Sequence, residues 1–214
     1  MIAIVDYGLG NLHSIGKVLS MFSEVRITRS PLELMEAEKI VLPGVGAFPD
    51  AVSNLKEASI FNLLQELAKT KPFLGICLGM QLLFSESTEG GKIPGLNIIK
   101  GIVRKLEGRM KIPHIGWNIV EFQKLRYGLH GRVPCSVEFH PLFSGIQDKS
   151  YFYFVHSYYA DCEEDVTIAK TTYSDFSFSS VVAKGNILGC QFHPEKSGSI
   201  GLKLLENFAK CVNI

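Results

Sequence analysis

The first half of the chain alternates short apolar runs with segments of helical periodicity, and this alternation constrains the fold more than any other feature. Four apolar runs are typical of buried strands: residues 2–7, 24–28, 39–44 and 72–77. Three segments carry apolar residues at helical spacing: residues 11–22, 50–69 (one helix or two) and 80–87. A strand followed by a helix, repeated along the chain, predicts parallel strands joined by crossover helices.

The second half of the chain predicts antiparallel strands joined by short turns. Strand-like runs occupy residues 101–106, 115–122, 151–160, 166–173 and 178–192. The last run contains Lys184, Gly185 and Asn186, a hairpin signal. An amphipathic helix over 199–212 follows. We therefore predict an α/β fold, with a mostly parallel central sheet flanked by helices and an additional antiparallel portion. Because no linker or repeat interrupts the 214 residues, we expect a single domain over residues 1–214.

Composition argues against several function classes. With 22 basic and 21 acidic residues, the formal charge of +1 predicts neither a nucleic-acid partner nor an anionic membrane. The start of the chain lacks the basic region of a signal peptide, and no segment approaches the ~20 apolar residues of a membrane span.

The cysteines indicate thiols rather than disulfides or metal ligands. Their number, five, is odd, and no CxxC pair is present. Cys135 and His140 are too few to form a metal site. We expect a soluble cytoplasmic protein with free thiols, no metal and no cofactor.

A cysteine between two glycines, in "GICLG", gives the chain its clearest chemical signal. Cys77 matches the G-x-nucleophile-x-G pattern of a sharp strand-to-helix turn, where Gly75 and Gly79 relieve crowding. The first N–H groups of the following helix favour a thiolate, and the Leu78 N–H can point toward a developing oxyanion. The alternative is that Cys77 is a small buried apolar residue.

A cysteine nucleophile needs a base and a group that orients the base. His193 ends an apolar run, and Pro194 biases it toward an extended conformation. Residues i and i+2 of an extended segment share a face, so Glu195 can reach the imidazole. His156 is the main rival base, and His114 is similarly ambiguous; the aromatic neighbours of His156 favour a core histidine.

Two glycine-containing turns are less specific. "LPGVGAF" (residues 42–48) follows a strand and can turn a backbone N–H toward an anion, but taken in isolation it is better explained as a simple strand-to-helix turn. "GLGNLH" (residues 8–13) resembles the start of a dinucleotide fingerprint, but His13 stands where the third glycine belongs. A tight turn is the better interpretation of the second segment.

Taken together, these stretches resemble a known family. "LPGVGAF", "GICLGMQLLF", "PHIGWN", "YFYFVHSYY" and "GCQFHPEKSG" occur in this order in the triad-type (class I) glutamine amidotransferases. Within that family the chain is similar to the glutaminase subunits of imidazole glycerol phosphate synthases, over nearly its whole length. The resemblance implies that Cys77 attacks the carboxamide of glutamine, that His193 shuttles the proton and that Glu195 orients His193. A glutamyl thioester then releases ammonia and, after attack by water, glutamate.

The resemblance also implies further site residues and a partner. It places Gln81 and Glu89 along the glutamine, with Ser157 and Tyr158 near the backbone end of the substrate. The oxyanion strand comprises Gly44, Val45 and Gly46, beside the Leu78 amide.

The implied partner is a (β/α)8-barrel cyclase subunit. It forms a heterodimer with the glutaminase and uses the ammonia in histidine biosynthesis. Asn11 and Lys196 match positions that face this partner.

One segment departs from the family pattern. Residues 124–139 form an apparent insertion, rich in turn formers and basic residues, which we expect to lie away from Cys77. It leaves open an alternative acceptor, in which a related glutaminase supplies ammonia for amidation of a surface sugar. A cysteine hydrolase or peptidase would have no reason to keep Gln81 and Glu89, and a non-catalytic regulatory subunit would be expected to lose one of the three triad residues.

Overall fold

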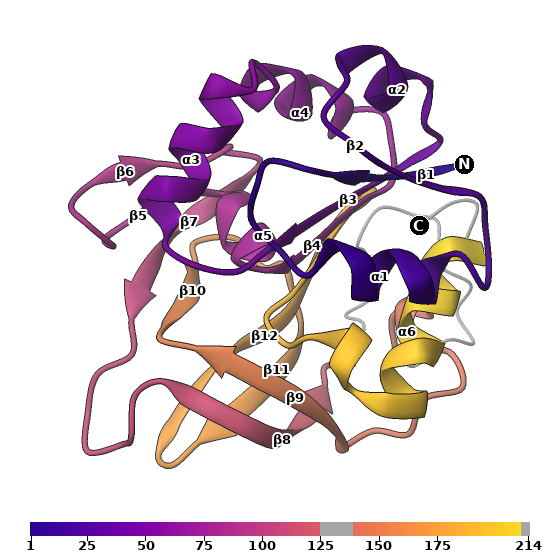
Figure 1. Cartoon of the computed structure of the whole chain (residues 1–214). Helices are drawn as coiled ribbons and strands as arrows, with labels where there is room; N and C mark the ends of the chain where they lie inside the picture. Colours follow the sequence, from indigo (N-terminus) through magenta and orange to yellow (C-terminus); the bar gives the residue numbers. More distant parts are fainter. Residues whose placement is uncertain (125–138, 211–214) are drawn as a thin grey trace.

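The computed structural model describes residues 1–124 and 139–210, and its centre is a mixed sheet (Figure 1). Within the described residues this sheet has nine strands, in the spatial order β2 (Val25–Thr28), β1 (Ile2–Val5), β3 (Lys39–Gly44), β4 (Phe73–Cys77), β13 (Ile187–Cys190), β12 (Phe176–Lys184), β11 (Thr167–Tyr173), β8 (His114–Phe122) and β9 (Ser150–His156). The strands from β2 to β13 run parallel, and the pairs from β13 to β9 are antiparallel. The predicted α/β fold class is confirmed.

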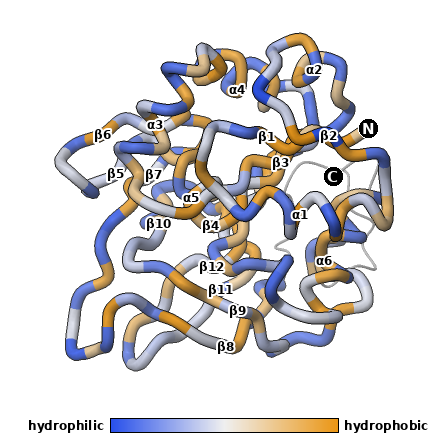
Figure 2. Tube along the Cα trace, viewed as in Figure 1, coloured by the Kyte–Doolittle hydropathy of each residue, from blue (hydrophilic) through white to orange (hydrophobic). Residues whose placement is uncertain are grey.

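Helices cover both faces of the parallel part of the sheet, because its strands are apolar on both faces. In β1, Ala3 and Val5 belong to one core cluster, and Ile2 and Ile4 belong to the other. The first cluster includes residues of α2 (Pro31–Glu36), α3 (Phe48–Glu57) and α4 (Phe61–Leu67). The second includes residues of α1 (Leu12–Leu19) and α6 (Gly198–Lys210). Figure 2 shows hydrophobic residues along the central strands and more hydrophilic residues on the peripheral loops.

A second, smaller sheet flanks the first. Among the described residues it has four strands, in the order β10 (Tyr158–Cys162), β7 (Ile99–Lys105), β5 (Phe84–Ser87) and β6 (Ile93–Pro94). The single strand predicted over 151–160 is wrong, because the chain leaves the large sheet at Ser157 and continues as β10 beside β7. The helix predicted over 80–87 is also wrong in extent. Helix α5 (Leu78–Leu82) is short, and the residues after it pair with β7 as β5.

Other expectations differ in detail. The segment 50–69 forms two helices, α3 and α4, which are separated by Ser59 at φ 57°. Helix α2 was not predicted from the sequence. Two 3-10 turns, η1 (Pro141–Phe143) and η2 (Pro194–Lys196), complete the described elements. The hairpin turn at Gly185, with φ 58°, is confirmed. Residues 125–138 of the segment interpreted as an insertion lie outside the described residues.

Over residues 1–124 and 139–210, no helix has both the length and the hydropathy of a transmembrane segment.

Candidate active site

Cys77 is the last residue of β4 and lies at a sharp turn into α5. Its backbone has φ 55° and ψ −112°, a region that side-chain-bearing residues rarely occupy. Strain of this kind costs on the order of 1–3 kcal/mol and persists only where the surroundings enforce it. The strand-to-helix elbow predicted from "GICLG" is therefore confirmed as a backbone geometry.

Both glycines of the motif are needed for close packing. A Cβ at Gly75 would lie 2.6 Å from the carbonyl oxygen of Gly79 and 2.8 Å from the Cα of Met80. A Cβ at Gly79 would overlap the carbonyl of Leu42 in β3. Helix α5 therefore rests directly on the backbones of β3 and β4, and this contact fixes where the elbow stands.

His193 and Glu195 meet as the sequence predicts. Nδ1 of His193 lies 2.9 Å from Oε1 of Glu195, and only 2% and 0% of the two side chains are exposed. His193 is extended, at φ −100° and ψ 95°, as expected of a residue before proline. Glu195, however, reaches the ring from the 3-10 turn η2 and not from an extended segment. The expected contact is present, with a different local geometry.

The charge state of His193 is set by its neighbours. Burial alone lowers the pKa of its ring, but the hydrogen bonds and charges of Cys77 and Glu195 outweigh burial and raise that pKa to about 10. Among the described residues, Nε2 of His193 and Oε2 of Glu195 are buried without a hydrogen bond of normal geometry. Apo sites often hold such groups close but poorly aligned. The ring is thus protonated at neutral pH, with Nε2 available for a reacting group.

A chain of side-chain amides leads to the sulfur. The Nε2 group of Gln81 donates to the Tyr158 carbonyl at 2.9 Å and to Oε1 of Gln191 at 3.0 Å. Nε2 of Gln191 in turn lies 3.7 Å from Sγ of Cys77. Sequence reasoning did not select Gln191. Its position two residues before His193, on the same side of an extended segment, was the signal that could have identified it.

His156 and His114 form a pair in the interior of the protein. Nδ1 of His156 lies 2.9 Å from the Tyr158 carbonyl, and its Nε2 lies 3.0 Å from Nδ1 of His114. Burial lowers the pKa of His156 to about 3 and that of His114 to about 4. Both rings are therefore neutral and hydrogen-bonded, which agrees with the interpretation of His156 as a core histidine.

The predicted oxyanion strand lies beside the nucleophile. Gly44, the last residue of β3, is in register with Cys77 in the parallel ladder. The Tyr7 hydroxyl donates to the Pro43 carbonyl at 2.7 Å and so anchors the end of this strand. Gly46 has φ 105°, and Val45 between the two glycines is 38% exposed. The loop is therefore held in place at Pro43, while Val45 after it is exposed to solvent and flanked by glycines.

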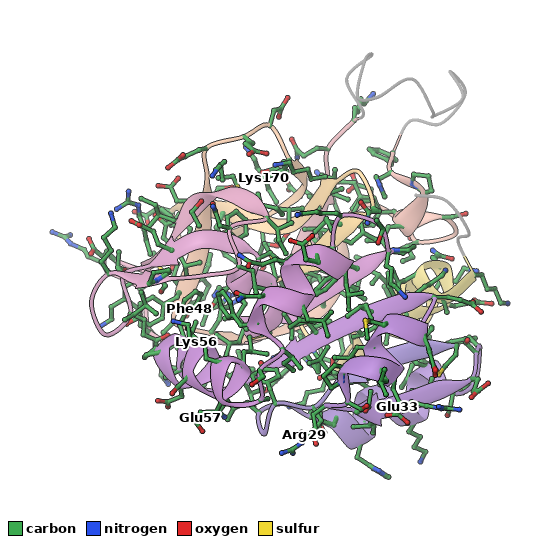
Figure 3. All side chains as sticks on the ribbon, turned by 90° about the horizontal axis from the view of Figure 1, so that it is seen from above. Arg29, Glu33, Phe48, Lys56, Glu57 and Lys170 are labelled. Atoms are coloured by element: carbon green, nitrogen blue, oxygen red, sulfur yellow. The ribbon has the colours of Figure 1, made fainter. Side chains whose placement is uncertain are left out.

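Glu89, expected along the substrate, also contacts the protein. Its Oε2 accepts a hydrogen bond of 2.9 Å from the backbone N–H of Phe48, at the start of α3. Phe48 is labelled in Figure 3 and is fully buried. Burial, followed by the charge of Glu89, raises the pKa of the Tyr158 hydroxyl. Glu89 therefore lies near both the helix that follows the glycine loop and Tyr158.

Ser157 and Tyr158 lie where the chain passes between the two sheets. The Ser157 carbonyl accepts a hydrogen bond from the Leu106 N–H at 2.8 Å, which ties the crossover to the end of β7. At Tyr158 it is the backbone carbonyl that contacts Gln81.

Of the two residues expected to face a partner, one is exposed and the other is partly buried. Lys196 is exposed, and its Nζ lies 5.9 Å from the ring centroid of Tyr153. Asn11 is partly buried and precedes α1, which contacts η2.

An exposed apolar face lies on β8 and the edge strand β9 of the large sheet. Its residues stand opposite one another in register, and we call it the β8–β9 face; it comprises Ile115, Trp117, Ile119, Tyr151, Tyr153 and Val155. Ile115, Trp117 and Tyr151 are 58%, 56% and 54% exposed. The Val155 carbonyl oxygen lies 3.8 Å from Sγ of Cys77. One strand thus connects an exposed apolar surface to the thiol.

Within the described residues, no group of three or more His, Cys, Asp or Glu side chains converges as a metal site. Cys77, Cys162 and Cys190 are free thiols. Burial, followed by the charges of Glu195 and Cys77, raises the pKa of Cys190, which keeps Cys190 a neutral thiol behind the site.

The fold and the site have counterparts among known proteins. The family model "Glutamine amidotransferase class-I" matches residues 3–211, so the chain belongs to the class I glutamine amidotransferases. Imidazole glycerol phosphate synthase subunit HisH of Methanocaldococcus jannaschii is 47% identical over 98% of this chain and 99% of its own length. The subunit of the same name from Bacillus cytotoxicus is 45% identical over 97% of this chain and 93% of its own length.

Solved structures agree on the fold. A crystal structure titled as that of a glutamine amidotransferase has a TM-score of 0.71, with 16% identity, over 99% of this chain and 100% of its own. The structure of PurLQS from Thermotoga maritima has a TM-score of 0.67, with 17% identity, over 97% and 96% of the two chains. At these identities the likeness concerns the fold alone.

Proposed function

We propose that this chain is the glutaminase subunit of an imidazole glycerol phosphate synthase, in which Cys77, His193 and Glu195 hydrolyse glutamine to glutamate and ammonia. The observation that carries the proposal is the strained elbow at Cys77 beside a protonated, buried His193–Glu195 pair. The full-length similarity to synthase subunits at 45–47% identity supports the specific assignment.

The proposed reaction begins with the sulfur of Cys77 as a thiolate and the proton on His193. The sulfur attacks the carboxamide carbon, an S–C bond forms, and the carbonyl electrons move to the oxygen. When this intermediate collapses, the C–N bond breaks and the nitrogen takes the proton from Nε2 of His193, so that ammonia leaves. The neutral ring then takes a proton from water, whose oxygen attacks the thioester carbon and releases glutamate and the thiolate. Glu195 holds the ring through Nδ1 during both steps.

The oxyanion requires N–H donors on the side of the elbow away from His193. The Leu78 N–H, at the first position of α5, lacks an intrahelical partner by construction. The second donor in this proposal is an amide of the loop Gly44, Val45 and Gly46, next to Cys77 in the ladder. Gln81, Glu89, Ser157 and Tyr158 surround the remainder of the glutamine. In this scheme the amide of Val45 turns toward the site only when partner and acceptor are bound.

The partner in this proposal is a (β/α)8-barrel cyclase subunit that forms a heterodimer through the β8–β9 face. Exposed apolar patches of this kind mark interaction surfaces, and Lys196 at the rim of the patch adds a charge. Asn11 directly precedes α1, which contacts η2. Because β9 carries both this face and the carbonyl next to the sulfur, ammonia released at Cys77 has a short route to a bound partner. A shielded route is needed because ammonium, the dominant form in neutral water, is no nucleophile.

Further parts of the proposal concern the chain as a whole. Residues 1–214 act as one domain, since β13 from the C-terminal half pairs with β4 and carries the base to the nucleophile. A cytoplasmic location suits a reaction that needs a reduced thiol. The alternative acceptor, a surface sugar, was suggested by the segment 124–139, most of which lies outside the described residues. Nothing in residues 1–124 and 139–210 favours that alternative.

The test replaces Cys77 by Ala in the complex with the barrel subunit. We expect loss of glutamine hydrolysis and of glutamine-dependent synthesis, with synthesis from ammonium salt at raised pH retained. Cys162→Ala is the matched control, because Cys162 is a free thiol in β10 whose sulfur contacts the Ala160 carbonyl and the Ser179 hydroxyl. Substantial glutamine hydrolysis by the Cys77→Ala complex would overturn the proposal.

A further inference from the structure

We propose that Gln191 is a hydrogen-bond donor to the nucleophile: its side-chain amide holds the Cys77 sulfur in its ionised form and, at its other end, fixes Gln81. The inference rests on the proposed function, because it takes Cys77 as the reacting group.

The geometry places Gln191 between the thiol and the substrate side of the site. Gln191 is completely buried, and its Nε2 lies 3.7 Å from Sγ of Cys77, within range for a hydrogen bond to sulfur. Its Oε1 accepts from Nε2 of Gln81 at 3.0 Å. The backbone of Gln191 is held as well, since its N–H donates to the Ser180 carbonyl at 2.9 Å. Gln191 is therefore a fixed bridge between two groups of the proposed reaction.

The network also determines which end of the Gln191 amide faces the sulfur. The Tyr158 carbonyl can only accept, so Gln81 must turn its NH2 group toward it. The same NH2 group contacts Gln191, which must therefore present its carbonyl oxygen there. Only the NH2 group of Gln191 remains for Cys77. An N–H donor stabilises a thiolate acceptor more than a thiol, because bonds to ionised groups are about twice as strong.

Besides Gln191, the sulfur of Cys77 faces the Val155 carbonyl oxygen at 3.8 Å, which can only accept, and several titratable groups. Among residues 1–124 and 139–210, the titratable groups that interact with Cys77 are Tyr7 after β1, Cys190 in β13, and His193 with Glu195 behind it at η2. Burial raises the pKa of Tyr7 and of Cys190, so both are neutral. His193 is then the cation beside the sulfur, and Gln191 is the neutral donor. With Cys77 only 6% exposed, water is a poor substitute for a lost donor.

Two variants separate the two ends of the bridge. Gln191→Glu keeps an oxygen for Gln81 and replaces the donor near the sulfur by an acceptor. Gln191→Met keeps the length of the side chain and removes both contacts. Gln65→Glu is the control, because Gln65 also donates its amide to a backbone carbonyl, that of Leu96 in the connection between β6 and β7, away from the thiol.

The experiment measures alkylation of Cys77 by iodoacetamide as a function of pH, by mass spectrometry of the peptide that carries it, together with glutamine kinetics of the complex. In both Gln191 variants we expect alkylation at pH 7 to slow by about tenfold or more, corresponding to loss of one hydrogen bond to an ionised group. The rates should approach those of the wild type at high pH, where the thiol ionises without help. The KM for glutamine should rise in Gln191→Met and change little in Gln191→Glu.

Wild-type alkylation profiles in folded Gln191 variants would overturn the proposal, as would a slowing that persists unchanged at high pH, because that indicates blocked access. Since alkylation needs no glutamine turnover, this failure differs from failure of the proposed function, which the Cys77→Ala complex reports. Thermal unfolding of each variant identifies those that are folded, and either folded Gln191 variant decides the question.

Discussion

Gly75→Ala tests the argument that direct contact between backbones positions the nucleophile. The new Cβ would lie 2.6 Å from the Gly79 carbonyl oxygen and 2.8 Å from both the Gly79 carbonyl carbon and the Met80 Cα. All three are backbone atoms of α5, so no flexible side chain can move aside. The helix itself must shift away from β4, and Cys77 lies between the two.

The size of the effect follows from these distances. Real Cβ contacts are essentially never under 3.0 Å, so α5 must retreat by at least about 0.4 Å. Overpacking of this kind costs on the order of 1–3 kcal/mol of stability. A displacement approaching 1 Å at reacting atoms costs on the order of 100-fold in rate, so we expect kcat for glutamine to fall by about 10-fold to 100-fold.

The assay compares glutamine turnover and thermal unfolding of Gly75→Ala with those of Gly16→Ala. Gly16 lies in α1, and the nearest neighbours of a Cβ there are side-chain atoms: Cδ1 of Ile27 at 3.2 Å, and Cγ1 of Ile27 and Cδ1 of Ile4 at 3.7 Å. We expect near-normal activity in this control. Gly79→Ala, whose Cβ would collide with the Leu42 carbonyl, should lower turnover and Tm further than Gly75→Ala does. Normal turnover and an unchanged Tm in Gly75→Ala would refute the packing argument.

Four further predictions follow from the site. His193→Ala should lower kcat nearly as far as Cys77→Ala, with Glu195→Ala losing less, because a thiol keeps some thiolate when its base is merely misoriented; a normal His193→Ala would contradict this. Val45→Pro removes an N–H and should cost about 10²–10³ in partner-activated kcat while leaving Cys77 open to alkylation. In the folded chain His156 has a pKa of about 3, so between about pH 6.5 and 3 the unfolded chain binds more protons than the folded chain. The free energy of unfolding should therefore fall as the pH falls through this range. His156→Phe should reduce this pH dependence, measured by urea unfolding at several pH values. Trp117→Lys should weaken complex formation with the barrel subunit in a pull-down without slowing alkylation, and undiminished binding would exclude the β8–β9 face.

The sequence predicted the elements that repeat a local rule. The elbow followed from two glycines around Cys77, since only a turn without flanking side chains lets α5 rest on β3 and β4. The contact between His193 and Glu195 also followed from spacing. Its 3-10 geometry did not, because Pro194 starts a turn whose closing hydrogen bond, from Ser197 to the Pro194 carbonyl, is a feature of the folded chain.

Features that depend on contacts between distant parts of the chain were not predicted. The aromatic run 151–160 alternates in the same way in either sheet, and only the pairing of β10 with β7 decides that the chain changes sheets at Ser157. The residues after α5 likewise became β5 because β7 was available as a partner. Gln191 was missed because its role depends on the side chains of Gln81 and Cys77, which lie more than 100 residues earlier in the chain.

The most direct test of the account is covalent labelling by a chloroketone analogue of glutamine, located by peptide mass spectrometry. An analogue that occupies the glutamine site presents its reactive carbon where the carboxamide carbon would stand. We predict a single modification on Cys77, prevented by excess glutamine and lost in Cys77→Ala, with Cys162 and Cys190 unmodified. Modification of another residue at the same rate in Cys77→Ala, still prevented by glutamine, would contradict the assignment of Cys77 as the nucleophile.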